Sequence, residues 1–90
     1  MSAYQIIERP VITEKSTKLA RLYDQYTFEV SYQANKIQIK QAVEKAFDVD
    51  VLKVNTSIMP SKERRWGHKP AWKKAVVTIH PGQVIEGFVA

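Results

Sequence analysis

The spacing of the apolar residues changes once in the first half of the chain, and this change constrains the fold most strongly. Across Tyr26–Tyr32, apolar and polar residues alternate, which is the period of a half-buried β-strand. Across Asn35–Phe47, the apolar residues recur at intervals of three and four, which is the period of a helix with one apolar face. Asn35 and Gln38 resemble a capping box, so the helix is predicted to begin there.

Further elements are predicted on both sides of this strand and helix. Residues 13–23 are typical of a short helix with Thr13 as its N-cap. β-Branched residues predict strands at Val49–Met59 and at Trp72–His80, where Pro81 and Gly82 supply the following turn. A minor strand is added at Tyr4–Ile7.

The periods also predict which residues face the core. The aromatic residues of the alternating strand are in phase with Val30, so we favour core packing over a base-stacking platform like that of an RNA recognition motif. The residues expected on apolar faces are Ile12, Ser16, Leu19 and Tyr23; Tyr26, Phe28, Val30 and Tyr32; Ile39, Ala42, Val43, Ala46 and Phe47; and Leu52, Val54, Thr56 and Ile58.

We therefore predict an α+β fold, with residues 1–90 as a single domain. Its small, mostly antiparallel sheet has three to four strands, with two helices on one face. The chain contains no cysteine, so neither disulfides nor thiolate metal sites can stabilise it. Its N-terminal residues lack the pattern of a signal peptide and no apolar run approaches about 20 residues, so we expect a cytoplasmic location without membrane insertion.

The positive charge is concentrated in the segment Pro60–Ala75. This segment carries six basic side chains and one acidic side chain, a net charge of +5, whereas the rest of the chain carries eight of each. The whole net charge therefore lies in sixteen residues, which would attract a polyanion. Prolines at both ends and Gly67 near the middle predict a long basic hairpin loop, an extension of about residues 60–72.

Two tryptophans distinguish this segment from a solvated run of charges. Exposed tryptophans are costly without a partner, and aromatic rings stack on unpaired bases while Lys and Arg contact phosphates. We predict that the segment binds RNA, although Trp72 is the tryptophan expected to fold back on the core. The predicted RNA-binding residues are Lys62, Arg64, Arg65, Trp66, His68, Lys69, Trp72, Lys73 and Lys74, together with Lys36 and Lys40, for which a solvated surface is an equal alternative.

Catalytic, metal and cofactor sites find little support in the sequence. His68 and His80 lack metal-ligand spacing, and the three glycines form no phosphate cradle. We expect a non-enzymatic protein without a cofactor. One alternative is a free-standing nucleic-acid-binding module, and a weaker one is an acylphosphatase-like hydrolase, which would need a glycine-bearing phosphate cradle near the first strand.

Several stretches together resemble the universal large-subunit ribosomal protein family numbered twenty-three. They are RPVITEKS from Arg9, NKIQIKQAVEKAFDVDV from Asn35, VNT from Val54 and WKKAVVTIHPGQ from Trp72. The resemblance implies a domain that binds large-subunit ribosomal RNA and neighbouring ribosomal proteins beside the polypeptide exit tunnel, in a bacterial or organellar ribosome. It also implies a hairpin along the RNA, here Lys62–Lys74, although the compact PSKERRWGHKPA leaves its reach toward the tunnel open.

The same resemblance assigns a protein-docking role to two acids. In bacterial members, the glutamate of the P-x-[IV]-[ST]-E-K element is the docking point for trigger factor and helps bind the signal recognition particle. The matching residue is Glu14, and Asp48 resembles a secondary contact. As a first-turn acid, Glu14 would also interact favourably with the helix dipole.

Overall fold

The computed structural model describes residues 3–64 and 67–85, and it describes only the backbone of residues 3–4, 62–64 and 67–69. The elements in chain order are α1 (Ala3–Ile6), β1 (Ile7–Pro10), α2 (Glu14–Tyr23), β2 (Gln25–Val30), α3 (Lys36–Phe47), β3 (Val51–Met59), β4 (Lys62–Arg64), β5 (Gly67–Lys69) and β6 (Trp72–Ile79). The predicted α+β class is confirmed. The prediction of a strand at Tyr4–Ile7 is wrong, because a one-turn helix occupies most of that stretch before β1 begins.

Both longer helices begin at their predicted caps. The Thr13 hydroxyl accepts a hydrogen bond from the Ser16 amide at 3.1 Å, and the Ser16 hydroxyl accepts one from the Thr13 amide at 2.7 Å. Asn35 and Gln38 form the same reciprocal pair before α3, at 2.8 and 3.1 Å. Each pair satisfies two amides that a helix start otherwise leaves unpaired, so these boundaries follow from residues only three apart.

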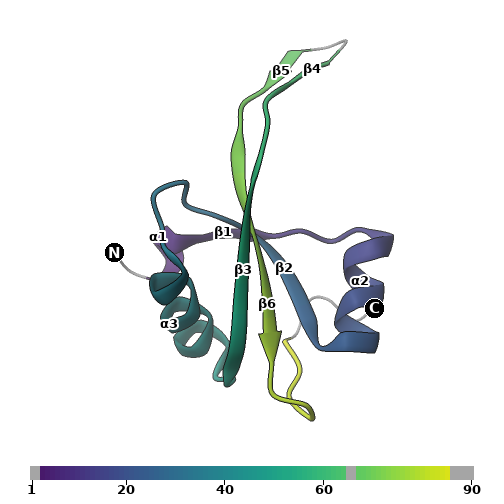
Figure 1. Cartoon of the computed structure of the whole chain (residues 1–90), viewed down its shortest axis with the longest axis vertical. Coiled ribbons are helices and arrows are strands. Elements are labelled where there is room, and N and C mark those ends of the chain that lie inside the picture. Colours follow the sequence, from purple (N-terminus) through teal and green to yellow (C-terminus); the bar gives the residue numbers. More distant parts are fainter. Residues whose placement is uncertain (1–2, 65–66, 86–90) are drawn as a thin grey trace.

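The main sheet is antiparallel, with the strand order β1-β2-β6-β3. Beyond Met59 and Trp72, the β3–β6 hairpin continues into β4 and β5, which pair with each other and project from the body (Figure 1). Residues 62–64 and 67–69 were predicted as loop but form this short ladder. A hairpin of two paired strands supplies partners for backbone groups that a loop would leave to water.

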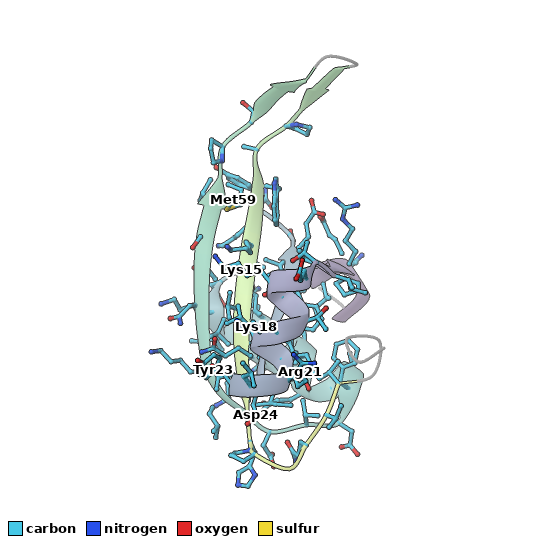
Figure 2. All side chains as sticks on the ribbon, turned by 90° about the vertical axis from the view of Figure 1, so that its right-hand side faces the viewer. Lys15, Lys18, Arg21, Tyr23, Asp24 and Met59 are labelled. Carbon is cyan, nitrogen blue, oxygen red and sulfur yellow. The ribbon has the colours of Figure 1, made fainter. Side chains whose placement is uncertain are left out.

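The two long helices lie on opposite faces of the sheet. The Phe47 ring of α3 stacks on Phe28 of β2, with the ring centroids 5.6 Å apart. The preceding residue of β2, Thr27, points the other way and lines a hollow with Ser16 of α2. Figure 1 shows α3 and α2 on either side of the strands, and Figure 2 shows α2 in front of them.

The predicted arrangement of two helices on one face is therefore wrong. It treated Thr27 as a solvent-facing residue of a half-buried strand, but α2 covers Thr27 and leaves it 5% exposed. Ser16 and Ala20 are the buried residues of α2, and small side chains let a helix approach a sheet closely.

Among the described helices, none combines the length and the apolarity needed to cross a membrane.

Several residues predicted to face the core are exposed. Tyr32 lies beyond the end of β2, and Leu52 lies at a break in the pairing register between Val51 and Lys53, where an extra residue turns outward. The bulge places Val51 in the core instead. The exposed residues that were predicted as apolar-face positions are Ile12, Tyr23, Tyr32, Ala46, Leu52 and Ile58.

Candidate nucleic-acid interface

The backbone of the hairpin brings its predicted RNA-binding residues into a short ladder. The register pairs Lys62 with Lys69, and Arg64 with Gly67, while His68 lies opposite Glu63. Strands β3 and β6 lead directly into this ladder, so the sheet sets its position (Figure 1). The predicted residues Arg65 and Trp66 lie outside the described residues.

The two lysines at the start of β6 are directed to opposite faces of the sheet. The Lys73 ammonium donates a hydrogen bond to the Ala34 carbonyl at 2.5 Å, next to the start of α3. Lys74 lines a hollow on the other face together with Lys15 of α2. One of the three N–H donors of the Lys73 ammonium is therefore used within the protein, and the two lysines lie on different faces, so they are not equivalent. RNA binding by both stays a prediction.

Lys36 and Lys40 are exposed on α3, one turn apart. Glu44, one turn after Lys40, has a structural role, because its carboxylate accepts a hydrogen bond from the Val51 amide at 3.2 Å. That bond ties α3 to the start of β3. The exposure of the two lysines fits both alternatives, a solvated surface and a contact with phosphate, so their RNA binding stays a prediction.

Trp72 lies at the base of the hairpin, where it is half-buried and pairs across the ladder with Met59. It lines two neighbouring hollows together with Arg9 and Glu29. The Arg9 side chain donates a hydrogen bond to the Glu29 carboxylate, which joins β1 to β2 at this point. Trp72 thus packs partly on the body, as expected.

The structure adds a row of cations that the sequence analysis did not select. Lys15, Lys18 and Arg21 are exposed on α2 at intervals of three residues (Figure 2). The interval of three residues between these cations could have been recognised in the sequence. It was overlooked because the residues outside Pro60–Ala75 carry equal numbers of basic and acidic side chains. Lys15 shares a hollow with Lys74, so this row reaches the face of β6 opposite α3.

The two predicted docking acids do not form one cluster. Glu14 is exposed at the first position of α2, and Asp48 is exposed as the C-cap of α3, in the left-handed conformation with φ 54°. Since the two helices lie on opposite faces of the sheet, the carboxylates belong to separate surfaces. Their docking roles stay a prediction. Within the part of the chain that the structure describes, no group of three or more His, Asp or Glu side chains could hold a metal ion.

The comparison with known proteins identifies the family. Residues 5–87 match the family model described as ribosomal protein L23. The chain belongs to this family. It is 50% identical to large ribosomal subunit protein uL23 of Aquifex aeolicus, over 92% of this chain and 87% of the relative. It is 47% identical to the uL23 of Desulfatibacillum aliphaticivorans, over 98% and 97%, and 45% identical to the uL23c of Phaeodactylum tricornutum, over 97% and 88%.

Membership of the L23 family confirms the resemblance seen in the sequence. The family consists of non-enzymatic ribosomal proteins, which confirms the prediction that this chain is not an enzyme and removes the hydrolase alternative. The relatives come from bacteria and from a plastid, so the predicted location on a bacterial or organellar ribosome is also confirmed. As a member of the L23 family, the chain is a protein of the large ribosomal subunit.

Proposed function

We propose that this L23-family protein binds large-subunit ribosomal RNA beside the polypeptide exit tunnel and that its hairpin is the main anchor. Ribosomal RNA and neighbouring ribosomal proteins are the surroundings that membership of the large subunit implies. The observation that supports the anchor is the projection of Lys62–Arg64 and Gly67–Lys69 from the sheet (Figure 1). The segment that contains these strands carries the whole net charge of +5.

A projecting basic hairpin suits contact with an RNA backbone for two reasons. It can enter a groove between RNA helices that the wider body cannot enter, and each Lys or Arg that meets a phosphate releases condensed counterions. Phosphate contacts give affinity and orientation but little sequence information. Selectivity would come from the shape of the RNA and from stacked bases, for which Trp66 and Trp72 are the candidates. We propose that residues 1–90 act as one unit in this role, with the extension at about residues 60–72.

The salt dependence of RNA binding tests this proposal. Four to six phosphate contacts predict that the logarithm of the association constant falls with the logarithm of salt concentration with a slope of roughly −3 to −5. The slope can be measured by filter binding of the full chain to a transcript of large-subunit ribosomal RNA. Affinity that does not change with salt would contradict an anchor made of phosphate contacts.

We also propose that Glu14 is the docking point for trigger factor and contributes to binding of the signal recognition particle. Two features support this role: Glu14 is exposed, and the nearby Ile12 is 57% exposed, so a partner could combine an ion pair with an apolar contact. Glu14 is also the first residue of α2, a position that the helix holds in place through the Thr13 cap. Asp48 would be a second, separate contact on α3.

Replacing Glu14 with Ala should weaken docking. Loss of a hydrogen bond to a charged group costs about 1.5–3 kcal/mol, which corresponds to roughly ten- to a hundredfold weaker binding of trigger factor. Co-sedimentation of trigger factor with ribosomes that carry the variant measures this change. Glu8→Ala removes an exposed carboxylate from β1 and is the matched control. Equal sedimentation with the Glu14→Ala and wild-type ribosomes would remove Glu14 from the docking role.

A further inference from the structure

A hollow of about 410 Å³ lies where the hairpin leaves the sheet. The ladder between β2 and β6 ends at the pair Val30–Lys73, whereas the ladder between β3 and β6 continues to Met59–Trp72. Strand β6 therefore extends past the end of β2, and the space beside it is bounded by β1 and by the segment after β2. The volume lies within the roughly 300–1,000 Å³ that is typical of small-ligand sites.

Two aromatic residues line this hollow. Trp72 belongs to β6, and Tyr32 belongs to the segment that follows β2. Tyr32 is 56% exposed, so its ring remains accessible to a ligand. Aromatic rings are the surfaces on which proteins stack unpaired bases of RNA. The hollow thus supplies the apolar part of a nucleobase site.

The charged residues that line the hollow favour an uncharged ring over a phosphate. Arg9 and Lys73 are balanced by Glu8 and Glu29. The Glu29 carboxylate accepts a hydrogen bond from Arg9, and the Lys73 ammonium donates one to the Ala34 carbonyl. A phosphate would therefore meet two carboxylates whose negative charge offsets the positive charge of the two cations. The exocyclic amine of a base could instead donate a hydrogen bond to a carboxylate. The phosphates on either side of that base would then lie toward the basic hairpin.

We propose that this hollow accepts one unpaired nucleobase of the bound RNA, stacked against Tyr32 and Trp72. The proposal rests on the RNA-binding function proposed above and gives it a base-contacting site. It assigns Tyr32, which the sequence analysis placed in the core, to the RNA interface. It also gives Trp72 a role at the base of the hairpin that differs from the phosphate contacts of the basic side chains.

Tryptophan fluorescence of the full-length chain tests the site. Because the protein has two tryptophans, Trp66→Phe leaves Trp72 as the single reporter. In this background, the chain is titrated with single-stranded oligoadenylate and with an abasic strand of equal length and charge. Oligoadenylate should quench Trp72 and bind more tightly than the abasic strand. Tyr32→Ala should raise the Kd for oligoadenylate roughly 5- to 150-fold and leave the Kd for the abasic strand unchanged.

Two further variants control this experiment. Tyr23→Ala removes a similarly exposed tyrosine from the end of α2 and should not change either Kd (Figure 2). Tyr32→Phe keeps the ring and should retain affinity for oligoadenylate.

Equal affinity for both strands, with no effect of Tyr32→Ala, would overturn the base site and leave RNA binding intact. Failure of both strands to bind at low salt would overturn RNA binding itself. The Tyr32→Ala variant could instead bind RNA normally but be incorporated poorly into the large subunit. That result would indicate that a neighbouring protein contacts the hollow, and it would also overturn the base site.

Discussion

Neutralising the hairpin should reduce the affinity for large-subunit ribosomal RNA on the order of a hundred- to a thousandfold at physiological salt. The variant replaces the four cations of residues 62–69 with glutamine, which keeps each side chain long and polar. These cations are Lys62, Arg64, Arg65 and Lys69. At about 0.15 M salt, counterion release makes each phosphate contact raise the association constant by roughly a factor of five. Losing four contacts therefore lowers the constant by roughly five to the fourth power, or about 600-fold. Filter binding measures the change, and the salt slope should become shallower by about 3 to 4 units.

A second variant distinguishes the hairpin from the total charge. Replacing Lys15, Lys18, Arg21 and Lys45 with glutamine removes the same charge from the exposed surface of the body. If the hairpin is the anchor, this variant should lose only about tenfold or less, because screening limits attraction by charges that touch no phosphate. Equal losses in the two variants would mean that binding follows net charge, and the hairpin would no longer be the anchor. Circular dichroism of both variants verifies that the sheet is retained.

Replacing Phe28 with Ala should lower the free energy of unfolding by about 3–5 kcal/mol. Phe28 is fully buried in the middle of β2, and its ring stacks on Phe47 of α3. The substitution removes one of the apolar contacts between α3 and the sheet and leaves a cavity beside Ala75, its partner on β6. Small domains have only about 5–15 kcal/mol of stability in total, so the loss would be a large fraction of it. Urea unfolding followed by circular dichroism measures the change.

The matched control for Phe28→Ala is Tyr23→Ala, which truncates a ring that is 61% exposed and should change the stability by less than about 0.5 kcal/mol. A loss below about 1 kcal/mol for Phe28→Ala would contradict the core described above. The core also bears on function, since β3 and β6 continue into the hairpin (Figure 1). A destabilised sheet would hold the hairpin less firmly, so the variant should also bind RNA more weakly at temperatures near its unfolding transition.

Local sequence patterns were sufficient for most of the secondary structure. The boundaries of α2 and α3 follow from capping pairs three residues apart. The caps Thr13 and Asn35 and the pairing of Asn35 with Gln38 were predicted, whereas the pairing of Thr13 with Ser16 was not. The alternation in β2 placed Tyr26, Phe28 and Val30 in the core correctly. These features depend on contacts between near neighbours in the chain, so they can be recognised without knowing how the chain returns on itself.

Contacts between distant segments decided what the sequence analysis missed. Alternation shows that Thr27 and Phe28 point to opposite faces, but only the path of α2 determines that Thr27 is covered as well. Tyr32 continues the alternation of β2, yet the strand ends at Val30, where its ladder with β6 ends at Lys73. The aromatic ring that the pattern assigned to the core therefore lines a hollow.

By itself, the sequence determined that all the net charge lies in one segment, that a strand is followed by a capped helix, and that the chain resembles the L23 family. The tertiary structure alone decided that the helices cover opposite faces, that Lys73 and Lys74 serve different faces, and that Tyr32 and Trp72 line the same hollow. Charge and period are properties of neighbouring residues, whereas a face or a hollow exists only after strands distant in sequence have paired.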